Sequence, residues 1–366
     1  MSRTPNAVPP PYSANDERFR ASPAMTTRVD LGRVLSLRAA GVYYALALLL
    51  VALAVVTAAL GRPAYLSAVN LTNIVYQSAL IAIMAVAMTV VLITGNFDLS
   101  VASVAALAAA VQISLVDSTG FVPAMLLALG VASLVGLLNG ALVQFVGINA
   151  FIVTLGTLTA VRGLVLVVTN GRSLMVHDPA SLATMTGFES GRLASIPYPV
   201  FYMAGFTLVV WFVLTFTVVG RRVHAVGGNA EAARLSGINV AAYKLGAFVL
   251  SSLAAGFAGV LYGCRFGAIN PTALQGDELT VIAAAILGGT SLFGGAGSVI
   301  KTLAGALLLF TLTNGFNILD LGANYQGLIE GTVLVVAAAI YTLGGKARRR
   351  NRPVAAGTTP LTKEAV

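Results

Sequence analysis

The chain has 366 residues, of which 57% are hydrophobic and only 10% are charged. This balance excludes an ordinary water-soluble protein, because soluble domains carry about 25% charged residues. The mean hydropathy of +0.88 indicates instead a protein that crosses a lipid bilayer. The chain has one cysteine, Cys264, and two histidines, His177 and His224. These leave few groups for metal binding or histidine-based catalysis, so no metal site and no catalytic residue are expected.

Apolar runs that are long enough to cross a bilayer as helices recur along most of the chain. They lack the alternation of a transmembrane barrel, so we predict an all-α, polytopic membrane helix bundle of about ten spans. The spans are expected near residues 43–60, 70–94, 99–116, 121–145, 150–169, 199–219, 242–264, 278–290, 298–319 and 325–343. The runs 99–116 and 278–290 are the weaker ones. The second is shorter than the ~20 residues of a straight span and precedes a glycine-rich stretch, so it is either a short or broken span or a re-entrant segment.

The distribution of basic residues predicts the orientation. Three segments, 1–42, 220–244 and 344–366, hold 16 of the 22 Lys and Arg residues. Short loops rich in these residues stay in the cytoplasm, so both termini and the loop 220–244 are expected there. Termini on the same side require an even number of crossings, which favours a spanning 278–290. The loop 170–198 is then external, and both histidines are expected to be solvated.

Three regions follow from this pattern: a disordered basic cytoplasmic N-terminal extension (1–42), a transmembrane domain (43–343) and a basic cytoplasmic C-terminal tail (344–366). We expect no cleavable signal peptide, because the first apolar run begins late and lacks a small-x-small cleavage site. The basic residues lie beside spans and lack interleaved aromatic residues. They therefore indicate attraction to anionic membrane lipid rather than nucleic-acid binding.

The segment 95–100, with the sequence GNFDLS, places an acidic side chain between two apolar runs. An ionisable group near the bilayer centre costs about 2.5–3.5 kcal/mol and normally faces a cavity or a partner. Asp98 is predicted to cap a helix that begins at Leu99, by accepting the amide hydrogens of Ser100 and Val101. A broken helix that lines a polar path would show the same residues, and the two interpretations are compatible. The charge pattern places the segment toward the cytoplasmic side.

Other polar side chains also lie within predicted spans: Asn73, Gln77, Asn139, Arg162, Asn314, Asn317 and Glu330. Amides such as Asn314 and Asn317 either join helices by hydrogen bonds or contact a solute. Arg162 and Glu330 have opposite charges, and we hypothesise that they pair inside the bundle.

A complete short helix is predicted inside the loop 220–244. Asn229 is suited to cap its N-terminus, Glu231 falls in its first turn, Arg234 near its end, and Gly237 is a natural left-handed stop. One side is small and apolar, with Ala232, Ala233 and Leu235. Two helical turns are not stable alone, so either the membrane interface or a cytoplasmic partner must hold this helix.

Three motifs resemble one known family in their sequence and order. They are GNFDLSVASVAAL at 95–107, GGNAEAARLSGINV at 227–240 and INPTALQGDELTVIAAAILGGTSLFGGAGSVIKTLAGALLLFTLTNGFNIL at 269–319. Together they resemble the permease subunits of bacterial ABC importers for ribose, xylose and related simple sugars, over roughly residues 65–343. The relatives usually have GGIDLSVGS in the first motif, from which Asn96, Phe97 and Ala102 depart.

The resemblance implies a homodimer of permeases, two cytoplasmic ATP-binding subunits and an external, periplasmic sugar-binding protein. ATP and Mg²⁺ would be used by the ATPase, since the chain has no phosphate-binding loop and no cofactor of its own is expected. The coupling helix held by the ATPase would comprise Gly228, Asn229, Glu231, Ala232, Arg234, Leu235, Ser236 and Gly237. The substrate path would include Asn96, Phe97, Asp98, Ser100, Asn314 and Asn317.

The expected function is that of a non-catalytic transport subunit in the bacterial inner membrane. It would translocate a monosaccharide by alternating access, along a path at the subunit interface. One alternative is an ABC permease for another small solute, such as a branched-chain amino acid. A second is an ion-coupled secondary carrier, for which Asp98 and Glu330 are candidate coupling groups. An intramembrane enzyme is disfavoured, because a nucleophile with a neighbouring base is not evident.

Overall fold

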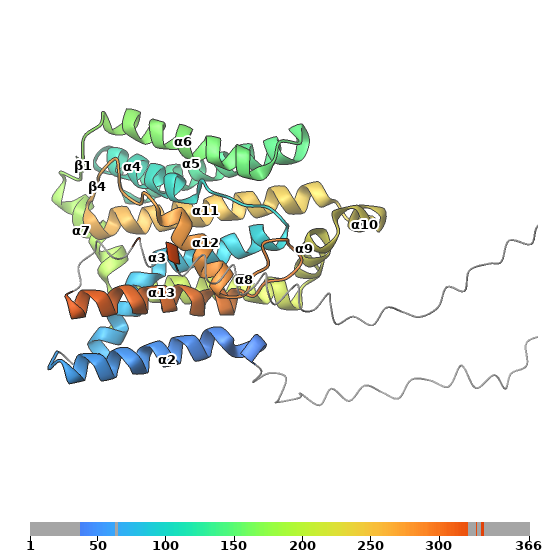
Figure 1. Cartoon of the computed structure of the whole chain (residues 1–366). Coiled ribbons are helices and arrows are strands. Elements are labelled where there is room, and N and C mark those ends of the chain that lie inside the picture. The colour runs from blue at the N-terminus through green and yellow to red at the C-terminus, as the bar shows by residue number, and fades with distance from the viewer. Residues whose placement is uncertain (1–36, 63–64, 321–326, 328–330, 333–366) are drawn as a thin grey trace, which may run out of the picture. The chain divides into compact units, whose positions relative to one another are not determined.

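The computed structural model describes residues 37–62, 65–320, 327 and 331–332. Residues 1–36 of the predicted N-terminal extension, the predicted C-terminal tail, most of the predicted span near 325–343 and Glu330 lie outside these residues. The prediction that the disordered extension reaches residue 42 is wrong, because the first described helix begins at Leu37 and continues the apolar run toward the N-terminus. In the described part, eight helices are long and apolar enough to cross a membrane. The prediction of an all-α, polytopic helix bundle is confirmed, and the chain is a multi-pass membrane protein (Figure 1).

The long helices match the predicted spans closely, because uninterrupted apolar sequence of this length is a strong signal. They are α2 (Leu37–Ala59), α3 (Ala68–Ile93), α4 (Val101–Thr119), α5 (Phe121–Ala141), α6 (Ala150–Thr169), α8 (Tyr198–Phe216), α11 (Val240–Phe266) and α13 (Val299–Leu319). A π-helical turn, η2 (Leu142–Val146), extends α5. The apolar run 99–116, one of the two weaker predicted spans, forms a full-length helix, α4. Most side chains of α3 and α4 are buried, so these two helices form the centre of the bundle.

Four shorter helices connect the long ones: α7 (Pro179–Ser190), α9 (Val218–Gly228), α10 (Ala230–Leu235) and α12 (Asp277–Leu287). Two antiparallel pairs of two-residue strands complete the described elements. They are β1 (Leu174–Met175) with β4 (Ala268–Ile269), and β2 (Arg192–Leu193) with β3 (Ile196–Pro197). The β1–β4 pair ties the loop that contains α7 to the end of α11.

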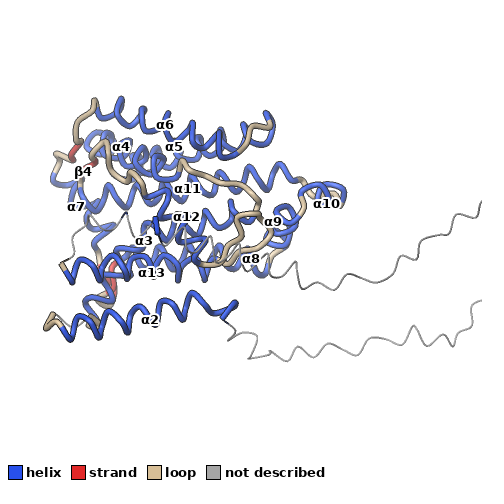
Figure 2. The backbone as a smooth tube through the Cα atoms, in the orientation of Figure 1, coloured by secondary structure: helices blue, strands red, loops and turns tan. Residues whose placement is uncertain are grey.

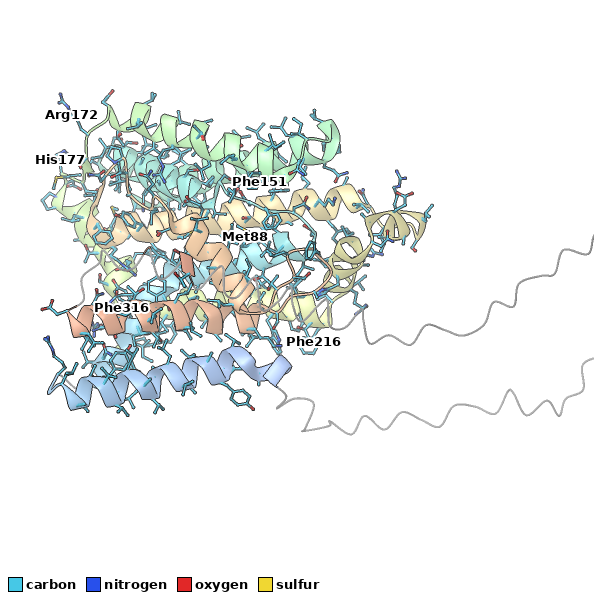
Figure 3. The ribbon with its side chains drawn as sticks, viewed as in Figure 1. Met88, Phe151, Arg172, His177, Phe216 and Phe316 are labelled. Atoms are coloured by element: carbon cyan, nitrogen blue, oxygen red, sulfur yellow. The ribbon has the colours of Figure 1, made fainter. Side chains whose placement is uncertain are left out.

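The long helices run between two ends, which we call the α7 end and the α10 end (Figure 1). Arg172 and His177 lie at the α7 end, whereas Phe216, the last residue of α8, lies at the other (Figure 3). Helix α11 connects the ends, since it begins next to α10 and finishes beside the β1–β4 pair. The predicted external loop and the predicted cytoplasmic loop therefore lie at opposite ends of the bundle.

Two crossings of the bundle are interrupted by irregular chain, visible as loop between helices (Figure 2). The first interruption is the segment 94–100, between α3 and α4. The second surrounds α12, whose 11 residues span only about 16 Å. Strand β4 precedes α12 at the α7 end, while the amide of Gly295 after it donates to the carbonyl of Ile93 at the α10 end. The chain thus crosses the bundle here, and the predicted short or broken span is confirmed.

Candidate functional site

Asp98 lies in the irregular segment 94–100 and is completely buried. Its Oδ1 accepts hydrogen bonds from the amide of Ser100 at 3.0 Å and from the hydroxyl of the same residue at 2.6 Å. Its Oδ2 accepts a third from the hydroxyl of Ser251, on α11, at 2.8 Å. The predicted bond from the Ser100 amide is confirmed. The expectation that the helix begins at Leu99 is wrong by two residues, because Asp98 and Ser100 form a turn before α4 starts at Val101.

The hydrogen bonds of Asp98 continue into two further helices. The amide of Asn139 on α5 donates to the Ser100 hydroxyl at 3.0 Å, and the hydroxyl of Thr157 on α6 donates to Asn139 Oδ1 at 2.6 Å. The three bonds engage both oxygens of the Asp98 carboxyl group. The network joins α4, α5, α6 and α11. It also satisfies polar groups that would be costly if left unpaired at membrane depth.

The position of Ser251 shows how deep Asp98 lies. Ser251 comes 11 residues after Val240, the first residue of α11 at the α10 end. At 1.5 Å per residue, this is roughly 16 Å along a helix of about 40 Å. The segment 94–100 starts at the α10 end, where α3 finishes, and re-enters the bundle. Its start lies at the same end as the basic loop 220–244, whose cytoplasmic location stays a prediction, and Asp98 itself reaches the middle of the bundle.

A cavity of about 630 Å³ opens beside this segment. It is lined by Gly95, Asn96, Phe97, Leu99, Val143, Ile148, Asn149, Ala150, Phe151, Lys244 and Ile282. Two of the predicted path residues, Asn96 and Phe97, are brought together here, while Asp98 and Ser100 are held in the network behind them. Apolar walls with a few fixed polar groups are typical of sites for small molecules.

The polar groups of the cavity come from three elements. The Nδ2 of Asn96 donates to Thr94 Oγ1 at 3.0 Å, which fixes the amide. The Oδ1 of Asn149 caps α6 by accepting the amide of Phe151 at 2.9 Å. Lys244 contributes an ammonium group from the second turn of α11. Sequence reasoning missed Asn149 and Lys244 as cavity residues, although an asparagine directly before an apolar run is a recognisable cap signal.

The other two predicted path residues lie on α13. Asn314 and Asn70 exchange side-chain hydrogen bonds at 3.1 and 2.9 Å, which join α13 to α3. Asn317 is exposed on the same helix. The structure therefore supports the helix-joining interpretation for Asn314 and does not bring either residue to the cavity described above.

Arg162 bonds to backbone at the second interruption. Its Nη1 donates to the carbonyls of Ala273 at 2.7 Å and Pro271 at 3.3 Å. Both carbonyls belong to irregular chain before α12, which needs such partners at membrane depth. Glu330, the hypothesised partner of Arg162, lies outside the described residues, so that pairing stays a prediction.

Helix α10 forms as predicted. Asn229 Oδ1 accepts the amide of Ala232 at 3.0 Å, and Gly237 follows the helix with a φ of 80°. Arg234 and Glu231 pair at 2.8 Å on the surface, and this hydrogen bond raises the pKa of Arg234. Leu235 is 81% exposed. The surface of α10 thus exposes an ion pair and an apolar side chain.

Helix α9, which leads into α10, was not predicted as a separate helix. Its Val223 and Val226 are buried, while Arg221 and Arg222 are exposed. His224 is half-buried, and its Nδ1 lies 3.3 Å from the carbonyl oxygen of Gly295. The expectation that His224 is solvated is therefore wrong, because α9 packs against the loop before α13. His177 is exposed, as expected.

Sequence reasoning also missed a buried ion pair at the α7 end. Glu189 Oε1 accepts from Arg265 Nε at 2.7 Å, and Oε2 accepts from the hydroxyls of Tyr76 and Ser190, each at 2.9 Å. The Arg265 guanidinium also lies over the Tyr76 ring, 4.1 Å from its centroid. These contacts tie α7 to α3 and α11. An arginine at the end of an apolar span was the one available signal.

Comparisons with known proteins agree with this architecture. The family described as the permease component of branched-chain amino acid transport systems matches residues 70–338. The ribose import permease protein of Escherichia coli K12 is 39% identical over 293 residues, which cover 80% of this chain and 91% of that protein. The D-allose transport system permease protein of the same strain is 34% identical over 80% of this chain and 90% of its own.

The L-arabinose ABC transporter permease protein of Azospirillum brasilense is 37% identical over 77% of this chain and 82% of its own. No solved structure matches the chain. The matched region contains the segment 94–100, helices α9 and α10, and the interrupted crossing around α12. The chain therefore belongs to the family of permease components that serve membrane transport systems, and its curated relatives are sugar permeases.

Proposed function

We propose that the chain is the membrane subunit of an ATP-driven importer for a monosaccharide of the ribose or xylose type, in the cytoplasmic membrane of a bacterium. The observation that carries this proposal is its 39% identity to a ribose import permease along 80% of the chain. The relatives named for D-allose and L-arabinose handle solutes of the same chemistry, neutral and rich in hydroxyl groups.

The cavity supports a sugar over the amino acid in the family description. The amides of Asn96 and Asn149 and the ammonium of Lys244 offer hydrogen bonds to hydroxyl groups. The ring of Phe97 offers a flat apolar surface for the carbon face of a sugar. We place the inner part of the substrate path here. Asn317, exposed on α13, remains a candidate for another part of the path.

The proposed assembly has three kinds of component. A cytoplasmic ATPase, which uses ATP and Mg²⁺, holds the coupling helix from Gly228 to Gly237, and the exposed Leu235 supports such a contact. A sugar-binding protein delivers substrate at the α7 end, and a second copy of the chain completes the path. Both termini are proposed to be cytoplasmic. ATP binding moves α10, and the bundle then opens its path to the opposite face.

Reconstitution with the cognate ATPase and binding protein tests the proposal. We expect ATP-dependent uptake of one sugar from a panel of ribose, xylose, allose and arabinose, with leucine as the amino-acid comparison. Glu231→Gln combined with Arg234→Gln should weaken the association of the ATPase and reduce uptake, whereas Arg192→Gln, an exposed arginine at the opposite end, should leave the association of the ATPase unchanged. Uptake without the ATPase, or uptake that follows an ion gradient, would contradict the proposal. Uptake of leucine alone would contradict the substrate class.

A further inference from the structure

We propose that a backbone junction at the α10 end transmits the movement of the coupling helix α10 to the cavity. It rests on the proposed function, because it names the route by which the ATPase would act. The junction consists of the end of α9 at Gly227, the end of α3 at Ile93 with the following Gly95, and the loop residues Gly294 and Gly295. These three segments are distant in sequence and meet through main-chain atoms.

Hydrogen bonds connect the three segments. The amide of Gly295 donates to the carbonyl of Ile93 at 2.9 Å, which joins the loop to the end of α3. The carbonyl of Gly295 lies 3.3 Å from Nδ1 of His224, which joins the same residue to α9. Within the loop, the amide of Ser291 donates to the carbonyl of Ala296 at 2.8 Å and closes it on itself. Both polar groups of Gly295 are therefore used to hold α3 and α9 together.

The backbones approach too closely for side chains. A Cβ atom on Gly227 would overlap the carbonyl oxygen of Ile93 and lie 2.7 Å from the amide nitrogen of Gly295. One on Gly294 would lie 2.7 Å from the carbonyl oxygen of Gly227 and 3.0 Å from Cα of Gly95. Gly294 also has a φ of 83°, which favours glycine. The contacts are thus direct, without flexible side chains between the segments.

The junction lies between the coupling helix α10 and both interrupted crossings. On one side, α9 ends at Gly228, and Asn229 is already the cap of α10. On the other side, Ile93 is followed at once by the segment 94–100, which carries Asn96 and Phe97 into the cavity. The loop of Gly294 and Gly295 follows α12, which contributes Ile282 to the same cavity. Close-packed contacts transmit displacement rather than absorb it, so movement of α10 reaches two walls of the cavity.

Gly227→Ala tests the route in the complete complex with its ATPase and binding protein. The added methyl group must separate α9 from Ile93, whereas Gly246→Ala adds the same group to a helical glycine of α11 that has open space around it. For Gly227→Ala we expect ATP hydrolysis to continue, while sugar uptake per ATP falls about tenfold or more, within the usual range of coupling energies. Gly246→Ala should keep the wild-type ratio.

A second measurement follows the movement itself. Phe97→Cys places a thiol in the cavity, and the native Cys264 is buried, so background labelling by a maleimide is low. In the wild-type background we expect ATP and Mg²⁺ to change the labelling rate of Phe97→Cys, and Gly227→Ala should abolish this change. If Gly227 had only a structural role, Gly227→Ala would lower the stability of the complex. ATP hydrolysis by the remaining complex would then still change the labelling rate at residue 97.

His224→Ala keeps the test decisive if Gly227→Ala fails to assemble, because it removes the contact with Gly295 and adds no volume. We expect it to lower uptake per ATP by about threefold or more. Wild-type uptake per ATP and a wild-type labelling response in His224→Ala or in an assembled Gly227→Ala would overturn the proposed route. A wild-type complex without ATP-dependent sugar uptake would instead reject the proposed function, so the two failures are distinguishable.

Discussion

Asp98 is a buried carboxylate whose hydrogen-bond partners are hydroxyl and amide groups rather than a cation. Ser100 supplies two donors and Ser251 supplies the third. These hydrogen bonds offset part of the cost of burying a polar group away from water. The carboxylate therefore serves to hold the start of α4 against α11, directly behind the cavity wall formed by Phe97.

We predict that Asp98→Asn lowers the melting temperature less than Asp98→Ala does. The asparagine retains one acceptor oxygen, and the Ser251 hydroxyl is able to rotate and accept from the new amide. The alanine leaves the Ser100 amide and two hydroxyls without their acceptor, at a cost of about 1–3 kcal/mol. Thermal unfolding of the purified variants in detergent measures the order. If Asp98→Asn keeps its melting temperature but loses sugar uptake, the carboxylate contacts the solute and the structural interpretation is wrong.

Local contacts of this kind were accessible from sequence, and distant ones were not. The bond from the Ser100 amide to Asp98 joins residues two apart, and turn chemistry predicts it. Ser251 lies 153 residues away from Asp98, and its identity as a partner depends on how α4 packs on α11. The Glu189–Arg265 ion pair was not predicted from the sequence for the same reason. In the sequence, Glu189 is one of several loop charges, and only folding of α7 onto α11 buries it.

At the scale of elements, α10 illustrates how much a short helix depends on its cap. It has six residues, so few intrahelical bonds stabilise it, and Asn229 satisfies one of its free amides. The arrangement of the exposed Glu231, Arg234 and Leu235 depends on that helix remaining formed. A partner that binds this surface must otherwise order it at the time of binding.

We predict that Asn229→Ala weakens the association of the ATPase by about fivefold, since loss of an N-cap costs about 1 kcal/mol. Asn239→Ala is the matched control. Asn239 caps α11 through the amide of Ala242 at 3.1 Å, but α11 has 27 residues and extensive packing, so it stays folded. The dissociation constant of the ATPase for each variant in lipid nanodiscs measures the difference. Equal affinities for Asn229→Ala and the wild type would exclude the cap as a determinant of docking.

Long helices and α10 were predictable because each has a strong local signal. Uniform apolar sequence marks the spans, and cap, dipole and stop residues mark α10. Helix α9 was missed because its apolar start continues α8 and its arginines resemble a simple cytoplasmic loop. The exact form of the crossing around α12 could not be predicted from the sequence either. Its irregular backbone is tolerated only because Arg162 and neighbouring helices satisfy it, and those contacts are tertiary.

At the scale of the whole molecule, both interrupted crossings lead into the same interior. The segment 94–100 enters from the α10 end, and the irregular chain before α12 enters from the β1–β4 pair. Irregular backbone inside a membrane requires protein or water around it, and the segment 94–100 supplies one wall of the cavity, while Ile282 of α12 adds to another. The rigid long helices hold these two segments in place. The irregular segment 94–100 therefore faces the proposed path directly.

The orientation of the bundle decides whether an ATPase can act on it at all. Ser236, next to α10, and His177, beside the β1–β4 pair, are exposed at opposite ends, and the native Cys264 is buried. We predict that a membrane-impermeant maleimide labels His177→Cys in cells whose inner membrane is intact, and Ser236→Cys only after that membrane is permeabilised. The basic loop 220–244 favours this orientation because Lys and Arg are retained on the cytoplasmic side. Labelling of Ser236→Cys in intact cells would put α10 beyond the reach of any nucleotide-binding subunit, since cytoplasmic ATP would then be separated from it by the bilayer.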